Sequence, residues 1–260
     1  MKNNSSTSSA PSIHDKIITL LKGDKIKITN EVHSAVEELV EILEAQATGK
    51  AEDVSEVLKW LEDKRKSYPS NIEEIGIKDL DKWHVDPKTG NISHESGKFF
   101  TMMGVRVKGA ARREVTSWTQ PMIKQQETGI LGILCKKING VKNYLFYAKF
   151  EPGNMFKLQL SPTLQATESN LKQAHGGKKP LFAEYFEEGG KGKVLASVVG
   201  VEDGGRFYMK TNRCMIVEVD ENEEIEVPED YIWLTLPQIK KLLKTDYAVN
   251  SLAREVMGSR

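Results

Sequence analysis

The sequence predicts an α+β fold, in which a helical segment is followed by a strand-rich body. As far as residue 67, apolar residues recur every three or four positions, which is the spacing of an amphipathic helix. Beyond residue 80 they form short apolar runs separated by turn residues, as strands do. No unit of 20–50 residues repeats, which argues against a solenoid. We therefore expect a disordered polar tail at 1–12, a helical segment at 13–75 and a strand-rich module at 76–260.

The helical segment is expected to contain three helices. A short one covers 13–21, and a longer one covers 32–47, where apolar residues occupy one helical face. Thr29 or Asn30 can cap the longer helix, because either side chain can accept a free backbone N–H. A third helix is expected over 54–61.

The strand-rich module is expected to open with a turn at Asp86–Asn91 between two possible strands. A hairpin is predicted around Ile138-Asn139-Gly140, because Asn-Gly suits a tight β-turn. A helix is expected over 167–175, ending at Gly176-Gly177, and another over 237–244. Further strands are expected at 98–107, 130–136, 143–150, 156–160, 194–201, 206–210 and 215–219.

The composition narrows the class of protein. Thirty-seven basic residues balance 37 acidic ones, and a nucleic-acid-binding domain usually carries a basic excess. The apolar runs are shorter than a membrane span, and the polar start carries no export signal. Two cysteines cannot build a disulfide scaffold. We therefore expect a cytoplasmic protein without nucleic-acid or membrane partners. Ten carboxylates against two lysines over 31–63 form either a surface for a basic partner or solvated helix faces.

Several common catalytic motifs are missing from the sequence. It has no G-x-G-x-x-G between a strand and a helix, no phosphate-binding P-loop and no G-x-S-x-G elbow. Its five histidines do not fall into the pairs that zinc sites use. We therefore expect no cofactor and no metal, so that catalysis depends on acids, bases and hydrogen-bond donors.

Two polar stretches are candidates for nucleotide contacts. From residue 98 to residue 113 the chain carries five basic residues and no acid, and Arg106 and Arg113 could hold phosphate. The alternative is a solvated strand edge. Trp118 and Gln120 together offer a stacking face and an amide that could hold a pyrimidine. The alternative is a tryptophan in the core.

A third stretch combines an acid with a base. Lys149 and Glu151 share one face of an extended chain and could act together. A row of neutral polar residues follows at alternate positions, which suits a carbohydrate or a nucleotide. This row consists of Gln159, Ser161, Thr163, Gln165 and Thr167.

Taken together, these segments resemble the NDP-hexose 2,3-dehydratase family of deoxysugar biosynthesis. The resemblance runs from about Ile75 to Arg254 and rests on ordered blocks rather than on a single motif. The blocks lie at 83–100, 104–107, 113–121, 126–133, 148–154, 159–167, 175–177, 202–208, 212–213 and 233–236.

The resemblance implies a Nudix-like mixed β-sheet core flanked by helices. A Nudix hydrolase holds Mg²⁺ on a glutamate-rich helix, whereas the segment 167–174 carries Glu168 as its single acid. The resemblance therefore implies the fold without the metal site or the hydrolysis. Family members resemble two tandem copies of this module, so a single copy implies a homodimer. A 3-ketoreductase that consumes the unstable product is the implied partner enzyme.

The implied reaction removes water across C2–C3 of a dTDP-4-keto-6-deoxyhexose to give a 3,4-diketo-2,6-dideoxy sugar. Glu151 or His94 would remove the C3 proton. Lys149 or Tyr208 would polarise the C4 oxygen or assist the leaving hydroxyl. The expected substrate-binding residues are Arg106, Arg113, Trp118, Gln120, Asn154, Gln159, Ser161, Thr163, Gln165, Arg206, Asn212 and Arg213.

Other functions remain open from the sequence. A nucleotide-sugar-binding module without catalysis would keep Trp118, Gln120 and the arginines but tolerate loss of Glu151 and His94. A divergent member would act on another NDP-keto-sugar. A Nudix hydrolase would need a metal site that the motifs do not supply. A helical protein-interaction module would depend on residues 13–67 instead.

Overall fold

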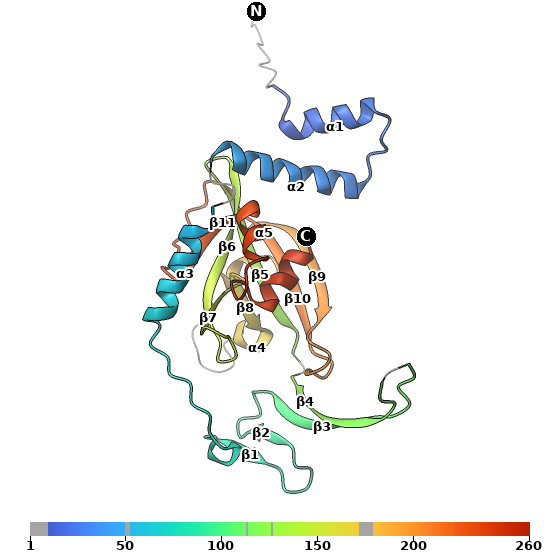
Figure 1. The fold of residues 1–260 in the computed structure, drawn as a ribbon, viewed down its shortest axis with the longest axis vertical. Coiled ribbons are helices and arrows are strands. Elements are labelled where there is room, and N and C mark those ends of the chain that lie inside the picture. The colour runs from blue at the N-terminus through green and yellow to red at the C-terminus, as the bar shows by residue number, and fades with distance from the viewer. Residues whose placement is uncertain (1–9, 50–52, 113, 126, 172–178) are drawn as a thin grey trace, which may run out of the picture.

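The structure, a computed structural model, describes residues 10–49, 53–112, 114–125, 127–171 and 179–260. Helices come first and two β-sheets follow, with further helices at the end of the chain (Figure 1). The α+β class predicted from the sequence is therefore confirmed. None of the helices in the described ranges combines the length and apolar character that a membrane span requires.

The first three helices attach to the body to different degrees. They are α1 (Ile13–Gly23), α2 (Asn30–Ala47) and α3 (Ser55–Ser67). The predicted cap of α2 is confirmed, because the N–H of Val32 donates to the Thr29 hydroxyl at 3.4 Å. Helix α1 packs against α2, and α2 packs against β6 and α5 (Figure 1). Val54, Val57 and Leu61 bury α3 in the main core.

The smaller sheet is an antiparallel meander that projects from the body as an arm (Figure 1). Its strands follow a short 3-10 turn at Ile77–Asp79. The predicted turn at Asp86–Asn91 joins the first two strands. The strands are β1 (Trp83–Val85), β2 (Ile92–His94), β3 (Thr101–Val107) and β4 (Trp118–Lys124).

The larger sheet has seven strands in the order β11-β6-β5-β10-β9, with β7 added to β6 and β8 added to β5. Strands β5 and β10 are parallel, and the other pairs are antiparallel. The predicted hairpin joins β5 to β6, with Asn139 and Gly140 at φ +52° and +79°. The strands are β5 (Gly129–Ile138), β6 (Val141–Phe150), β7 (Leu158–Ser161), β8 (Leu164–Thr167), β9 (Lys193–Val201), β10 (Thr211–Glu218) and β11 (Tyr231–Thr235).

Two strand predictions are wrong. Residues 206–210 form a turn with an isolated bridge at Phe207, because the chain reverses between β9 and β10. The polar row from Gln159 to Thr167 is not continuous either. The chain bends at Pro162-Thr163, so that β7 pairs with β6 whereas β8 pairs with β5.

The sheet has a core on each face. On one face α3, α5 (Leu236–Leu242) and α6 (Ser251–Gly258) cover Ile133, Tyr144 and Phe146. On the other face, Phe182, Tyr185 and Phe186 around a short 3-10 turn (Ala183–Tyr185) cover Leu134 and Leu145. Helix α4 (Glu168–Leu171) follows β8, and the rest of the helix predicted over 167–175 lies outside the described residues.

Candidate active site

Most of the predicted site residues in the body gather at one edge of the larger sheet. Strands β6, β8 and β9 end there, and β5, β7 and β10 begin there. The ends of strands leave backbone and side-chain groups free to meet a ligand. Both the Lys149–Glu151 pair and the segment 202–212 therefore lie at this edge, which we call the polar edge.

The strand register connects the two halves of the polar edge. Thr167 of β8, Gly129 of β5 and Asn212 of β10 lie in one lateral row. Residues paired across strands point to the same face, so Thr167 and Asn212 flank a position that has no side chain. A Cβ at Gly129 would lie 2.3 Å from Asn212 Oδ1, so only glycine fits there. Two strand spacings, about 10 Å, separate β8 from β10.

Lys149, Glu151 and Gln165 make direct contacts. Lys149 Nζ lies 3.4 Å from Glu151 Oε1, and Gln165 Nε2 donates to the same oxygen at 3.1 Å. The side chains of Lys149 and Glu151 are 24% and 29% exposed, so both are partly shielded and still reachable. Burial lowers the pKa of the Lys149 ammonium, although the Glu151 carboxylate opposes this. The result is a carboxylate beside an ammonium whose pKa lies below the ordinary lysine value.

The other amide atom of Gln165 has no partner. Gln165 Oε1 is buried and accepts no hydrogen bond among the described residues. A buried polar atom without a partner is costly, and such atoms concentrate at functional sites. A ligand hydroxyl beside Glu151 would satisfy it.

A second polar group lies at the starts of β10 and β5. The Asn212 amide donates to Glu202 Oε2 at 2.5 Å, and the buried Lys210 donates to the carbonyl of Glu127. Burial lowers the pKa of Lys210 and raises that of Glu255, which lies over Gly200. Lys210 and Glu255 were not singled out from the sequence, since nothing local marks a lysine as buried or brings Glu255 of α6 to β9.

The arm joins the polar edge through β4. Trp118 Nε1 donates to Gln120 Oε1 at 2.7 Å, and Gln120 Nε2 donates to the Gly205 carbonyl at 2.8 Å. Trp118 and Gln120 therefore bind each other, and both ends of the Gln120 amide already have protein partners. Arg206 pairs with Asp203 in the same turn. Tyr208 is 38% exposed, and its N–H donates to the carbonyl of Ile123.

A cleft of about 400 Å³ lies where the arm meets the body. Its walls come from the β2–β3 loop and from the segment after β4. The lining residues are Asn91, Gly97, Lys98, Phe99, Thr101, Met103, Lys124, Gln125 and Glu127. Because the carbonyl of Glu127 also binds Lys210, the cleft adjoins the polar edge.

His94 and Arg106 lie further out on the arm. His94 contacts Trp83 and Phe99 edge-on, with ring centroids 5.6 and 4.7 Å away, and its Nδ1 pairs with the Ser96 hydroxyl at 2.8 Å. Arg106 is exposed on β3. No contact in the described residues joins either side chain to Lys149 or Glu151, so the structure does not assemble all predicted residues into one site.

Several predicted binding residues hold the fold instead. The Thr163 hydroxyl donates to the Leu145 carbonyl at 2.5 Å and accepts the Leu134 N–H at 2.9 Å, where β5 and β6 separate. Ser161 is fully buried and accepts from Asn250 Nδ2 at 2.8 Å.

Three more of the predicted residues have backbone or edge positions. The Asn154 amide donates to the carbonyls of Lys149 and Lys157 and so shapes the loop after β6. Gln159 pairs with Lys149 across β7 and β6 and is partly exposed. Arg213 points to the face opposite Asn212 and donates to the Ser197 hydroxyl at 3.3 Å. Arg113 lies outside the described residues.

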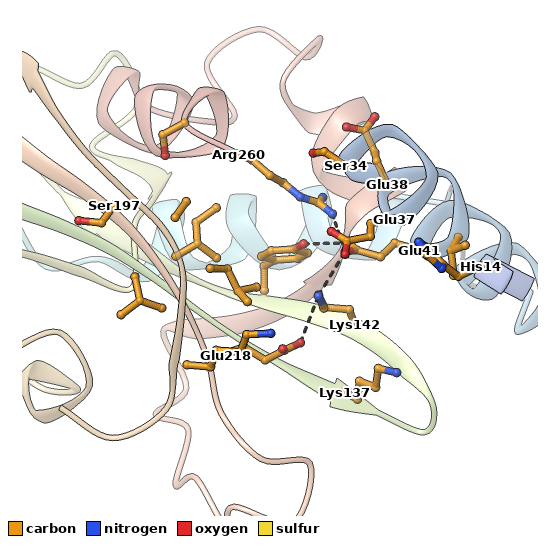
Figure 2. Close-up of a pocket in the computed structure, with 18 of the residues that line it drawn as sticks. His14, Ser34, Glu37, Glu38, Glu41, Lys137, Lys142, Ser197, Glu218 and Arg260 are labelled. Atoms are coloured by element: carbon orange, nitrogen blue, oxygen red, sulfur yellow. Dashed lines mark hydrogen bonds and ion pairs between the residues drawn. The ribbon is translucent and has the colours of Figure 1, made fainter. Parts of the chain in front are cut away.

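The opposite end of the sheet carries a larger pocket of about 700 Å³ (Figure 2). Glu41 of α2 is buried at its centre and accepts from the Tyr144 hydroxyl at 2.8 Å and from Arg260 Nη2 at 2.5 Å. Lys142 Nζ lies 3.4 Å from Glu41 and 3.1 Å from Glu218. Since the buried charges neutralise one another, we assign this network to attachment of α2 to the sheet.

In the ranges that the structure covers, no group of three or more His, Cys, Asp or Glu side chains is arranged to hold a metal ion. The two cysteines are buried, and burial raises the pKa of both thiols to about 12.

The comparisons with known proteins agree with the resemblance in sequence. Residues 54–259 match the family model described as NDP-hexose 2,3-dehydratase. The chain is 47% identical over 202 residues to a dTDP-4-dehydro-6-deoxy-alpha-D-glucopyranose 2,3-dehydratase from Saccharopolyspora spinosa, covering 76% of this chain and 40% of the relative. It is 40% identical over 211 residues to an enzyme of the same name from Amycolatopsis orientalis, covering 78% and 44%. The chain thus spans less than half the length of these relatives.

Among solved structures, the likeness is weak. An ADP compounds hydrolase aligns with a TM-score of 0.39 and 10% identity over 61% of this chain and 83% of its own. An Ap4A hydrolase from C. elegans aligns with a TM-score of 0.34 and 10% identity over 52% and 98%. At these TM-scores the likeness supports no argument, so the Nudix-like core rests on the family resemblance.

Proposed function

Because the chain belongs to the NDP-hexose 2,3-dehydratase family, we propose that it removes water across C2–C3 of a dTDP-4-keto-6-deoxyhexose at the polar edge. The observation that carries this proposal is the contact set of Lys149, Glu151 and Gln165, which lies within the matched segment. It supplies a carboxylate, an ammonium and an unpaired amide oxygen at one point.

The first step is proton transfer from C3 to the Glu151 carboxylate. The C4 ketone makes this proton acidic, because the electrons of the broken C3–H bond move into an enolate on the C4 oxygen. A cation near that oxygen stabilises the enolate, and such electrostatic stabilisation is usually a large part of catalysis. Lys149 Nζ, 3.4 Å from Glu151 Oε1, is close enough to serve. His94 remains an alternative base, and Tyr208 an alternative acid.

The second step expels the C2 hydroxyl. The enolate re-forms the C4 carbonyl, a C2=C3 double bond forms and the C2–O bond breaks. The hydroxyl leaves as water after taking a proton from Lys149 or from Glu151, which gained one in the first step. The C3 enol then tautomerises to the 3,4-diketone by losing its hydroxyl proton and taking a proton at C2. The steps balance without an oxidant or reductant.

This mechanism can be followed in heavy water. Tautomerisation takes the C2 proton from solvent or from a group in exchange with it. The product formed in D₂O should therefore carry one deuterium at C2, seen by mass spectrometry after reduction of the unstable diketone. A product without that deuterium would contradict the enol intermediate.

The pKa of Lys149 predicts a basic limb in the pH profile. Burial lowers the pKa of this ammonium below the ordinary lysine value. If the ammonium is the working form, kcat/KM falls as pH rises through this lowered pKa. Lys149→Arg should remove the limb, because arginine stays protonated, while also lowering the rate through altered geometry. An unchanged limb in the variant would assign it to another group.

Gln165 is expected to position Glu151 and to bind a sugar hydroxyl. Gln165→Leu removes both hydrogen bonds in a side chain of similar size. A hydrogen bond to a charged group contributes about 1.5–3 kcal/mol, so kcat/KM should fall by about 10–100-fold. The affinity for dTDP and the unfolding midpoint should barely change, which isothermal titration and thermal denaturation would check. A large drop in the midpoint with normal kcat/KM would make Gln165 structural.

The remaining parts of the proposal concern the oligomeric state, the location in the cell, the partner enzyme and the division of the chain. We propose that the chain forms a homodimer. We also propose a cytoplasmic location, a downstream 3-ketoreductase and the division into a tail at 1–12, a helical segment at 13–75 and a module at 76–260.

A further inference from the structure

The larger sheet ends at β9, and the outer edge of this strand is open. β9 stands last in the strand order, and no other strand in the described ranges pairs with its outer side (Figure 1). An open edge of nine residues presents a row of unpaired backbone donors and acceptors. Such an edge is ready to bind another strand.

The side chains of β9 do not protect this edge. No charged residue lies between 194 and 201, whereas isolated edges are usually guarded by charges, prolines or bulges. A register shift opposite Ile216 and Val217 disturbs the beginning of the strand, and the rest is regular. The exposed apolar residues alternate over both faces and are Val194 (52%), Leu195 (39%), Val198 (51%), Val199 (49%) and Val201 (67%).

In β9 beyond its register shift, alternate residues direct their backbone N–H and C=O groups to the open side of the strand. The N–H of Glu202 donates to the Lys210 carbonyl at 2.9 Å, which is an inward bond toward β10. In an antiparallel pair the inward and outward positions alternate, so Ser197, Val199 and Val201 present their N–H and C=O groups to the open side.

We propose that β9 of one copy pairs antiparallel with β9 of a second copy about a twofold axis. This inference rests on the homodimer of the proposed function and assigns its interface. The register that pairs all nine residues places Ser197 opposite the partner's Ser197. It brings Lys193 next to the partner's Glu202 and sets no like charges against each other. The strand is therefore complementary to itself, as a twofold interface requires.

A second copy fits this edge better than an unrelated strand. A self-pairing strand needs no outside recognition motif, and from Val194 to Val201 β9 offers backbone groups, aliphatic side chains and the Ser197 hydroxyl. In the dimer the two larger sheets would join into one continuous sheet.

The first test measures the mass of the full chain in solution by sedimentation or light scattering over a range of concentrations. We expect twice the 29.2 kDa of one chain. Val199→Lys should return the mass to one chain, because it places a charge on the edge. Val199→Pro should do the same, since it removes an outward N–H without breaking a bond to β10. The control is Val115→Lys, at a similarly exposed valine of the arm, which should stay dimeric.

The second test locates the contact. Ser197→Cys should give a covalent dimer with a short thiol-reactive crosslinker, whereas Val85→Cys on the arm should not. The native Cys135 and Cys214 are buried and should not react. A wild-type dimer that Val199→Lys and Val199→Pro leave intact, although both fold, would overturn the β9 interface but keep the homodimer. A monomeric wild type would overturn both, and dehydratase activity in that monomer would leave the proposed reaction standing.

Discussion

Replacing Glu151 with glutamine should lower kcat for dehydration by about 10²–10⁴-fold, the usual contribution of a general base. The amide has nearly the shape of the carboxylate but cannot take the C3 proton. The substitution also removes the ion pair of the wild-type protein, in which Lys149 Nζ lies 3.4 Å from Glu151 Oε1. Steady-state kinetics with dTDP-4-keto-6-deoxyglucose would measure the loss.

The affinity for dTDP and a matched control variant should distinguish the loss of catalysis in Glu151→Gln from general damage to the protein. Glu151 lies at the sugar end of the proposed site, so dTDP affinity should stay within a few-fold in a titration. The matched control is Glu188→Gln, at an exposed position, which should keep full activity. Normal turnover by Glu151→Gln would remove Glu151 from the mechanism and leave His94 as the base to test.

Removing Glu41 should cost the most stability. Glu41→Ala leaves Lys142 and Arg260 without the carboxylate they share, and it takes the acceptor from the buried Tyr144 hydroxyl. Breaking a buried ion pair on one side typically costs about 3–5 kcal/mol. Chemical denaturation should show this loss in the free energy of unfolding.

The control for this variant lies on the same helix. Glu37 is exposed, so Glu37→Ala should change the free energy of unfolding by less than about 0.5 kcal/mol. Tyr144→Phe removes one hydrogen bond only and should fall between the two. A Glu41→Ala variant as stable as the control would show that the buried network does not hold α2 to the sheet.

The fold could be predicted where local chemistry decides it. The Thr29 cap, the Asn139-Gly140 hairpin and the apolar runs of β5 and β6 each follow from a few neighbouring residues. Helix α6 was missed although Asn250 caps it locally by accepting the Ala253 N–H. The split between β7 and β8 was missed because it depends on contacts distant in sequence. The split is fixed by Thr163, whose hydroxyl bridges Leu134 and Leu145.

The candidate site could be predicted in part. Lys149 lies near the end of β6 and Glu151 directly follows the strand, two residues on, so their meeting follows from the extended geometry of the chain there. The contact of Gln165 with Glu151 joins β8 to the residue after β6 and needs the tertiary structure. A polar residue in sequence can also be a structural one, as Ser161 and Thr163 are. The burial of Lys210 and Glu41 could not be predicted, because the residues next to a lysine or a glutamate do not show whether its side chain is buried.

The most direct test of the proposed function is the mass of the product. Purified wild-type protein would be incubated with dTDP-4-keto-6-deoxyglucose in EDTA, beside Glu151→Gln, and the nucleotide sugars analysed by mass spectrometry. We predict a species lighter by one water with the wild type and none with the variant. An unchanged substrate mass with wild-type protein that still binds dTDP would contradict dehydration of this substrate and favour the binding module or another sugar.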